Sequence, residues 1–235
     1  MKKHPWRLLI IGSSLLLSLL FSNPRPGAAH SRAPNNLSNS ETDISGDYTV
    51  TGHSGSGTDY EGELRIQKQG KVYQFHWWAG NQFEGIGIVN GGYVAVSYSD
   101  NPSAIEDCGV IIYRILANGT LDGLWGFYGE DEMGTERAVH ARGTGLTGSY
   151  NVTGTNLTGS SYKALLTITE KGAGYELQWR NEKGFGVRRG NTLSVAYGGE
   201  QCSWVAYELK PNGELDGLWG PYGAENAGRE RAVPK

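Results

Sequence analysis

The stretch NGTLDGLWGFYG spans Asn118–Gly129, and the nearly identical stretch NGELDGLWGPYG spans Asn212–Gly223. A phrase that recurs in one chain is either a functional site used twice or a structural element that two copies of one fold require. Asn-Gly pairs favour tight hairpin turns in which both central residues take positive φ. Trp125 would lie in the strand that follows, and Gly123 would let that strand bend or let a neighbouring group approach closely. The structural interpretation therefore accounts for most of the phrase.

The similarity continues on both sides of the phrase. GDYTVTG (Gly46–Gly52) corresponds to GSYNVTG (Gly148–Gly154), and further matches follow through most of the chain. The spacing between equivalent residues shortens near residues 79–84 and 99–107, where surface loops would tolerate deletions. Repetition on this scale indicates duplication of one unit.

We predict that the two units cover residues 46–141 and 146–235, joined by the segment ARGTGLTG at 141–148. Segments such as LRI, VYQFHW and YVAVSY alternate in the way expected of strands with one buried and one solvent-facing side. Short strands joined by tight turns form an antiparallel meander, and closing that meander on itself removes its edges. The predicted fold class is all-β, with two tandem up-and-down meanders that each form an eight-stranded barrel around its own interior.

The N-terminus has the layout of an export signal. An apolar run at Leu8–Phe21 follows a basic start and precedes small residues that end at Ala29. The run is too short to span a bilayer comfortably. We therefore predict a signal peptide at 1–29 and a flexible polar leader at 30–45. The mature protein would be secreted or periplasmic, with a bacterial type of signal and no membrane attachment after cleavage.

The composition argues against a nucleic-acid partner. The chain has 21 basic and 24 acidic residues, so it presents no net positive field for nucleic acid and no polybasic membrane patch. Glycine is frequent, with 36 residues, and the chain has 13 tyrosines and 7 tryptophans. Glycine at turns, with aromatic and β-branched residues between them, is typical of an all-β protein.

The titratable residues give no catalytic signature. Asp122 and Glu136 recur as Asp216 and Glu230, and carboxylate pairs on barrel strands are in principle suited to acid–base chemistry. Because the acids repeat in both units, they most simply serve the fold, with Glu136 either solvated or inside a barrel beside a cation. The chain lacks a nucleophile elbow, a phosphate loop and a dinucleotide fingerprint, and its histidines are too scattered for a metal site. We predict a non-enzyme with no catalytic residues, no metal and no cofactor.

The order of the short motifs resembles a known group of proteins. The sequence runs through G-x-Y-x-V-x-G, Y-x-G-x-L-x-I, G-x-x-Y-x-x-x-W, C-G-V-x-x-Y, G-x-L-x-G-x-W and G-T-E. This order resembles small secreted bacterial β-proteins that are often labelled fibronectin-binding, and the resemblance implies an extracellular protein partner. In the second unit, Cys202-Ser203-Trp204 replaces C-G-V and Arg229 replaces the threonine of G-T-E, so the two units need not bind the same partner.

The meander also resembles the calycin group of barrels, which includes avidin-like and lipocalin-like proteins. Those barrels often open with Gly-x-Trp, and lipocalins stack a basic side chain from the last strand over that ring. Tyr48 and Tyr150 would occupy the ring position here, with Arg137 and Arg231 as the cations. The resemblance implies barrel-closing contacts Tyr48–Arg137 and Tyr150–Arg231, each contributing about 1 kcal/mol if partly desolvated.

The two cysteines, Cys108 and Cys202, occupy equivalent positions of the two units. In an exported chain an even number of cysteines favours a disulfide, which here would join the two units through matching faces. The alternative is a pair of buried thiols that duplication copied into both units. The sequence leaves both arrangements open.

Aromatic residues are the candidates for a partner surface. Trp78 adjoins a tryptophan that has a counterpart in the second unit, whereas Trp78 itself aligns with Arg180. Tyr128 and Tyr222 follow the repeated phrase at equivalent places. Exposed tryptophan and tyrosine are typical anchors at interfaces and on sugar-binding faces. The alternative is that a small barrel uses aromatic residues to fill its interior.

We therefore predict an exported, non-catalytic binding protein whose two barrel modules contact an extracellular protein. One alternative is a carrier of a small apolar ligand, which requires an open lumen lined by apolar side chains. A second alternative is a glycan-binding module that uses a strip of exposed aromatic residues.

Overall fold

A computed structural model describes residues 42–235, and the predicted signal peptide lies outside these described residues. The described part is built almost entirely from strands, with one short 3-10 helix, η2 (Ile105–Asp107). Within residues 42–235 we find no helix that has the length and apolar character needed to cross a bilayer.

Sixteen strands follow one another along the described chain. In the first repeat they are β1 (Gly46–His53), β2 (Asp59–Gln69), β3 (Val72–Ala79), β4 (Asn81–Asn90), β5 (Tyr93–Ser99), β6 (Gly109–Ile115), β7 (Leu121–Phe127) and β8 (Gly134–Thr144). In the second repeat they are β9 (Thr147–Thr155), β10 (Ser161–Lys171), β11 (Gly174–Gln178), β12 (Lys183–Arg189), β13 (Thr192–Tyr197), β14 (Ser203–Leu209), β15 (Leu215–Gly220) and β16 (Gly228–Pro234).

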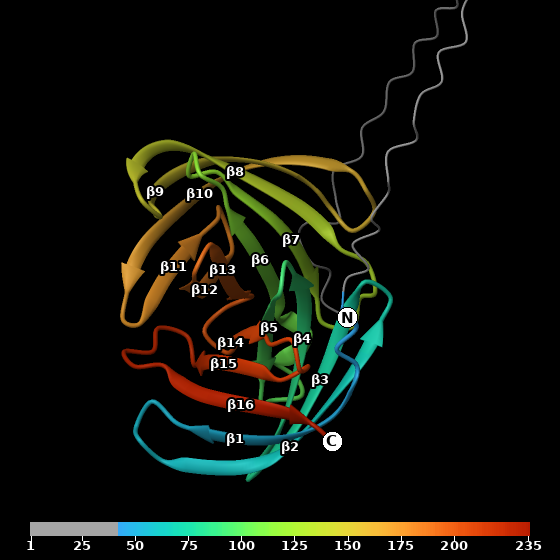
Figure 1. The fold of residues 1–235 in the computed structure, drawn as a ribbon. Coiled ribbons are helices and arrows are strands. Elements are labelled where there is room, and N and C mark those ends of the chain that lie inside the picture. The colour runs from blue at the N-terminus through green and yellow to red at the C-terminus, as the bar shows by residue number, and fades with distance from the viewer. Residues whose placement is uncertain (1–41) are drawn as a thin grey trace, which may run out of the picture. The chain divides into compact units, whose positions relative to one another are not determined.

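The strands form two closed antiparallel barrels of eight strands each, which confirms the predicted fold class. The terminal barrel has the order β1-β16-β15-β14-β5-β4-β3-β2, and the central barrel comprises β6 to β13. In Figure 1 the red strand β16 accordingly lies beside the blue strand β1. Closure leaves neither barrel with a free sheet edge.

The barrels do not coincide with the predicted units 46–141 and 146–235. Each barrel takes strands from both repeats, because β5 pairs with β14 and β13 pairs with β6. The central barrel is therefore inserted between the fifth strand and the last three strands of the terminal barrel. Equivalent strands of the two repeats present similar edges, so alternation predicts the strands but cannot tell which copy completes which barrel.

The first repeat joins the second within the central barrel. The segment 141–148, expected to be a linker, comprises the end of β8, a tight turn at 145–146 and the start of β9, and β8 pairs with β9 as a hairpin. The predicted leader also ends earlier than expected, because Ile44 is buried and packs in the core of the terminal barrel. Leu146 is its counterpart in the central barrel.

The barrels pack against each other through two apolar clusters. In one cluster Ile86 and Ile88 of β4 meet Val110 and Ile112 of β6. The second cluster lies between β12 and β14, which are the counterparts of β4 and β6 in the second repeat. Its buried members include Phe185, Val187, Trp204 and Ala206. Strands at this interface are buried on both faces, as parallel sheets usually are.

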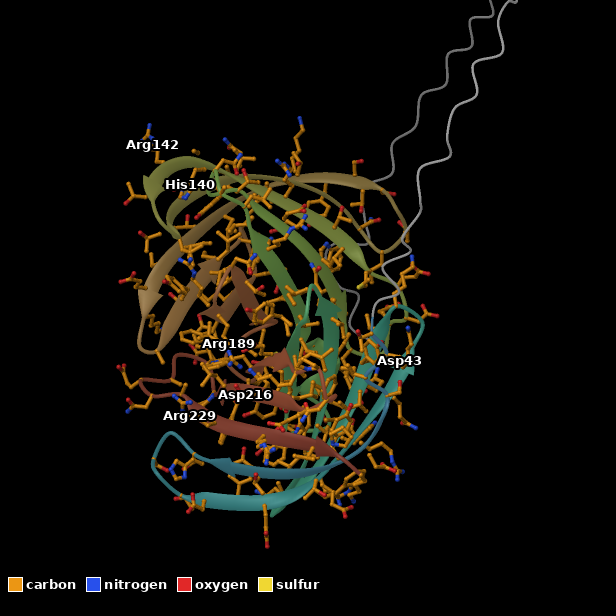
Figure 2. The ribbon with its side chains drawn as sticks, in the orientation of Figure 1. Asp43, His140, Arg142, Arg189, Asp216 and Arg229 are labelled. Carbon is orange, nitrogen blue, oxygen red and sulfur yellow. A yellow bond between two sulfur atoms is a disulfide. The ribbon has the colours of Figure 1, made fainter. Side chains whose placement is uncertain are left out.

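The segment YVAVSY shows the consequence of this packing. Its alternation predicted one wet face, but Ala95 and Ser97, which share one side of β5, are both fully buried. Their small side chains allow the other barrel to approach closely. The interface also holds a charged contact, in which Arg189 Nη2 of β12 lies 3.1 Å from Asp216 Oδ2 of β15 (Figure 2).

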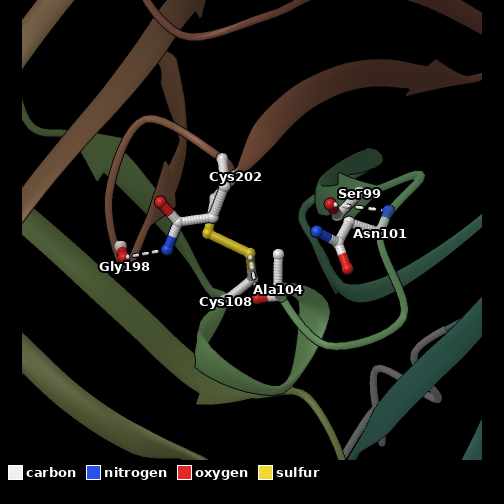
Figure 3. The surroundings of a disulfide bond; sticks show 7 residues. Ser99, Asn101, Ala104, Cys108, Gly198 and Cys202 are labelled. Atoms are coloured by element: carbon white, nitrogen blue, oxygen red, sulfur yellow. Dashed lines mark hydrogen bonds between the residues drawn. A yellow bond between two sulfur atoms is a disulfide. The ribbon is translucent and has the colours of Figure 1, made fainter.

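A disulfide joins Cys108 and Cys202 at the two places where the chain passes between the barrels (Figure 3). Both cysteines are fully buried, and the bridge settles the alternative that the sequence left open. Gly198, in the second crossing, lies against the first: a Cβ there would be 2.1 Å from the backbone oxygen of Asp107. The bridge therefore fastens the two crossings side by side, at the end of the central barrel where β6 begins and β13 ends.

The hairpins of the repeated phrase differ in detail from the prediction. Gly119 and Gly213 have φ of 78° and 82°, but no described residue other than glycine has positive φ. The Gly119 amide donates to the Leu116 carbonyl, and the Leu116 amide donates to the Thr120 carbonyl. The turn is thus a three-residue loop with glycine in the left-handed position, which is the next most common hairpin connection after the two-residue turns.

Candidate ligand-binding site

Each barrel encloses one glutamate in its interior. Glu136 on β8 is 4% exposed and Glu230 on β16 is 7% exposed. Burying a carboxylate without partners is very unfavourable, so its hydrogen bonds define the local structure. The sequence indicated that these acids serve the fold and allowed Glu136 to lie inside a barrel, where it is found.

Three donors surround Glu230 in the terminal barrel. Its Oε1 accepts hydrogen bonds from the Tyr207 hydroxyl and, at 3.1 Å, from Trp77 Nε1. Its Oε2 accepts from the Tyr60 hydroxyl at 2.9 Å. Tyr60 and Trp77 come from the first repeat and Tyr207 from the second, so the exchange of strands between repeats is what assembles this group.

The central barrel repeats the arrangement around Glu136. Its Oε1 accepts from the Tyr113 hydroxyl and, at 3.1 Å, from Trp179 Nε1, and its Oε2 accepts from the Tyr162 hydroxyl at 2.8 Å. None of the donors to Glu136 is a cation. The expectation that an internal glutamate would pair with a cation is therefore replaced by neutral hydroxyl and indole donors.

Glycines on the intervening strands make room for the tyrosine rings. Tyr207, Gly217, Glu230, Gly52 and Tyr60 lie in register on the neighbouring strands β14, β15, β16, β1 and β2. A Cβ at Gly217 would lie 2.5 Å from the Tyr207 ring, and one at Gly52 would lie 2.2 Å from the Tyr60 ring. Each ring crosses a glycine to bring its hydroxyl to the carboxylate.

This row explains the glycine in the repeated phrase. Gly123 plays the part of Gly217 in the central barrel, because a Cβ there would lie 2.5 Å from the Tyr113 ring. The close approach expected at Gly123 is thereby confirmed, and the approaching group is an aromatic ring.

Burial sets the protonation behaviour of both glutamates. Desolvation raises the pKa of Glu136 and of Glu230, while the hydrogen bonds from tyrosine and tryptophan act in the opposite direction. Burial beside Glu230 likewise raises the pKa of Tyr60 and Tyr207. The pKa of each glutamate is higher in the folded protein than in the unfolded chain. The stability that this difference contributes is therefore fully present at pH values below the pKa of the unfolded chain. It is lost as pH rises through the pKa of the folded protein.

We expect Glu136→Ala to lower the free energy of unfolding by about 3–5 kcal/mol, because it leaves three buried donors without an acceptor. Glu136→Gln keeps an acceptor and should lose much less. The free energy of unfolding of the Gln variant should also rise relative to that of the wild type as pH rises above the pKa of glutamate in the unfolded chain. Urea unfolding of the three proteins across that pH range measures both effects, and equal losses for Ala and Gln would contradict the acceptor role.

The terminal barrel has a pocket at the end of its lumen where Glu230 lies. Its volume is about 100 Å³. Five aromatic side chains, one carboxylate and two small aliphatic side chains line it: Tyr60, Trp77, Phe83, Tyr98, Trp219, Glu230, Ala79 and Val205. The rings of Tyr60 and Trp219 form one wall, with centroids 5.8 Å apart. The rings of Trp77, Tyr98 and Phe83 form the other, with successive centroids 5.8 Å apart.

At the same end of the central barrel, an additional aromatic side chain packs among the equivalent rings. Phe127 packs edge-on against Tyr197 and Trp125, with ring centroids 5.0 Å and 5.8 Å away. Tyr197 and Trp125 are 6% and 5% exposed, whereas their counterparts Tyr98 and Trp219 are only partly buried. The residue equivalent to Phe127 in the terminal barrel is Pro221, which is exposed. The duplicated barrels therefore differ at the site where a ligand would enter.

One of the three predicted surface aromatics is exposed. Trp78 is 43% exposed on the outside of the terminal barrel, beside the His76 ring and with the Arg65 guanidinium 6.0 Å from its ring centroid. This placement agrees with the expectation that Trp78 lies on the exposed surface.

The other two candidates, Tyr128 and Tyr222, hold the barrels together. The Tyr128 hydroxyl of the central barrel donates to Glu84 of the terminal barrel. The Tyr222 hydroxyl of the terminal barrel donates to Glu176 of the central barrel at 2.5 Å, and Lys171 Nζ lies 5.1 Å from the Tyr222 ring centroid. Their prediction as partner anchors is corrected, because both are partly buried at this interface.

The predicted barrel-closing pairs do not form. Tyr48 and Arg137 lie in different barrels, as do Tyr150 and Arg231, because the repeats exchange strands. The Tyr48 hydroxyl instead donates to the Ile44 carbonyl at 2.8 Å.

Tyr150 and the two arginines complete this correction. The Tyr150 hydroxyl donates to the Leu146 carbonyl at 2.8 Å. Arg231 pairs with Glu214 on the surface and Arg137 is exposed, since neighbours of the inward-facing glutamates must point outward. The ends of the barrels are thus fastened by tyrosine and backbone rather than by tyrosine and arginine.

Sequence reasoning missed the pocket although two signals marked it. The longer segment at 79–84 in the first repeat supplies Ala79 and Phe83 to the lining. The FYG of the first phrase becomes PYG in the second, which places Phe127 in one barrel and Pro221 in the other. Both signals are differences between the repeats, whereas the predicted barrel-closing pairs, the disulfide and two of the three predicted aromatic anchors lie at positions that the repeats share.

No protein-family model matches this chain, and no curated protein sequence matches it. The site is therefore interpreted from its own geometry.

Proposed function

We propose that this chain is an exported, non-catalytic protein that binds a small ligand in the mouth of the terminal barrel. The observation that carries the proposal is the aromatic pocket with Glu230 at its inner end. Ligand sites are concave, mostly apolar and supplied with a few fixed polar groups, and barrel mouths are a common place for them. The alternative predicted from the sequence was a carrier of a small apolar ligand, and the present proposal differs from it because the pocket holds a carboxylate.

The rigidity of the lining also supports binding. Trp77 is held by its bond to Glu230, and the Tyr60 hydroxyl is fixed on the same carboxylate. Side chains ordered before binding reduce the entropy that a ligand must overcome. The disulfide supports export, because such bonds persist in oxidising compartments.

A protein or glycan partner has less support from the described surface. Of the three aromatic anchors expected from the sequence, Trp78 is the one that stands exposed. A single exposed ring gives less reason for such a partner than the enclosed pocket gives for a small ligand.

Ligand-observed NMR with a library of small neutral, anionic and cationic fragments tests the proposal on the mature protein. Ala79→Phe should abolish fragment binding, because the added ring fills the pocket at a lining position. Asn181→Phe places the same ring at the aligned, exposed position of the second repeat and should leave binding unchanged. If no fragment binds, or if Ala79→Phe leaves binding intact, the proposed site is excluded.

A further inference from the structure

We propose, building on the ligand-binding role of the terminal barrel, that its pocket selects small organic ammonium cations. The ligand would place its cationic group between the two aromatic walls and against Glu230. This assigns a chemical class to the ligand, which the proposed function leaves open.

The charge of the lining favours a cation. Glu230 is the single ionisable carboxylate among the lining residues, and no lysine, arginine or histidine is among them. Its hydrogen-bond donors are two hydroxyls and one indole, so none of these partners neutralises its charge. A desolvated carboxylate attracts an opposite charge more strongly than the same group in water does. An anionic ligand would instead meet a like charge with no compensating cation in the lining.

The aromatic walls favour the same class of ligand. The face of an aromatic ring carries negative charge, and several rings around one space make the cage that recognises ammonium groups in other proteins. Here five rings line one pocket, with Tyr60 in contact with Trp219, and Tyr98 in contact with Trp77 and Phe83. The volume of about 100 Å³ suits a compact head group.

Glu230 retains acceptor capacity for a ligand. A carboxylate offers about four acceptor positions. Oε1 accepts from two donors, Tyr207 and Trp77, whereas Oε2 accepts from Tyr60 alone. A ligand N–H can therefore donate to Oε2 without displacing a protein donor, and a fully methylated ammonium can approach the same oxygen by charge alone.

The central barrel provides an internal comparison. Glu136 has the same three kinds of donor, but Phe127 packs against Tyr197 and Trp125, the counterparts of two residues that line the pocket of the terminal barrel. If Glu230 were needed only for folding, the terminal barrel would have no need of an accessible aromatic pocket beside it. The hollow beside Glu136 is lined mostly by polar and charged side chains, whereas aromatic rings line the pocket beside Glu230, so the aromatic binding role is assigned to the Glu230 group.

The experiment compares tetramethylammonium with tert-butanol, a neutral molecule of similar shape and size, by NMR titration of the mature protein. We expect tetramethylammonium to bind at least about tenfold more tightly than tert-butanol. Glu230→Gln should remove most of this preference. Glu136→Gln, which makes the same change in the central barrel, should retain it.

Each outcome separates the two proposals. Equal binding of both probes would overturn the cation inference and leave the ligand-binding role standing. Preference for the cation that persists in Glu230→Gln would also overturn it. Absence of binding by these probes and by every library fragment would exclude the proposed function itself. The comparison of probes on the wild-type protein does not depend on how well either variant folds.

Discussion

The isolated segment 108–202 is expected to fold as a monomeric barrel, whereas the isolated first repeat, 42–145, is expected not to. The segment contains all eight strands of the central barrel and both cysteines. The first repeat contains five strands of one barrel and three of the other, so it would expose four unpaired sheet edges. Exposed edges pair with other chains, and the repeat should aggregate or assemble with a second copy.

Light scattering coupled to size exclusion, together with thermal unfolding, measures this difference. A complementary variant deletes residues 100–202 and joins Ser99 to Ser203 by a short turn. Because β5 and β14 are antiparallel neighbours, this variant should form the terminal barrel alone. A monomeric first repeat that unfolds cooperatively would show that a repeat can close without strands from the other repeat, contrary to this arrangement.

Removal of the disulfide is the second change with a large expected effect. Cys108 and Cys202 are separated by 94 residues, and in the chain-entropy account a loop of this size contributes about 4–5 kcal/mol. The bridge also lies in a buried apolar cluster between the barrels, so its loss disturbs packing there. We expect the double variant Cys108→Ala/Cys202→Ala to remain a pair of barrels with much lower stability.

Guanidinium unfolding of the double variant and of the reduced and oxidised wild type measures the contribution. The reduced wild type controls for the change of side chain, since it keeps both sulfur atoms. Removing the bridge from the full chain and from segment 108–202 shows how much of the lost stability belongs to the central barrel, because both proteins contain the bridged pair. A double variant within about 1 kcal/mol of the oxidised protein would contradict the expected role.

The difference between the two barrels follows a pattern expected after duplication. The second copy of a site is free to change once the first retains the function. Here Phe127 packs among the interior rings of the central barrel, whereas the equivalent Pro221 of the terminal barrel is exposed. Both copies keep the internal glutamate, because its three donors require an acceptor whether or not the lumen is open.

Several features could be predicted from local patterns. Alternation and glycine spacing identified the strands, and the repeated phrase identified the duplication and its hairpins. These features depend on neighbouring residues, which is why a single sequence reveals them. The glycine at 123 could be assigned a close approach, but not the approaching Tyr113 ring, which comes from another strand.

The site depended on arrangements that local patterns do not contain. Glu230 meets Tyr60 and Trp77 only because β16 lies beside β1, which in turn pairs with β2. Tyr128 and Tyr222 look like surface anchors until the opposite barrel is placed against them.

An all-β chain made of two copies of one eight-stranded pattern could be predicted from the amino-acid sequence, because hydrophobic alternation and turn chemistry act over a few residues. The strands that complete each barrel could be identified from the three-dimensional pairing alone. The two repeats offer nearly the same edges to each other and to themselves, so the pairing energies are similar. The chain passes from one barrel to the other at the short segments 100–108 and 198–202. The resulting strand pairing places Glu230 beside the aromatic residues of the pocket.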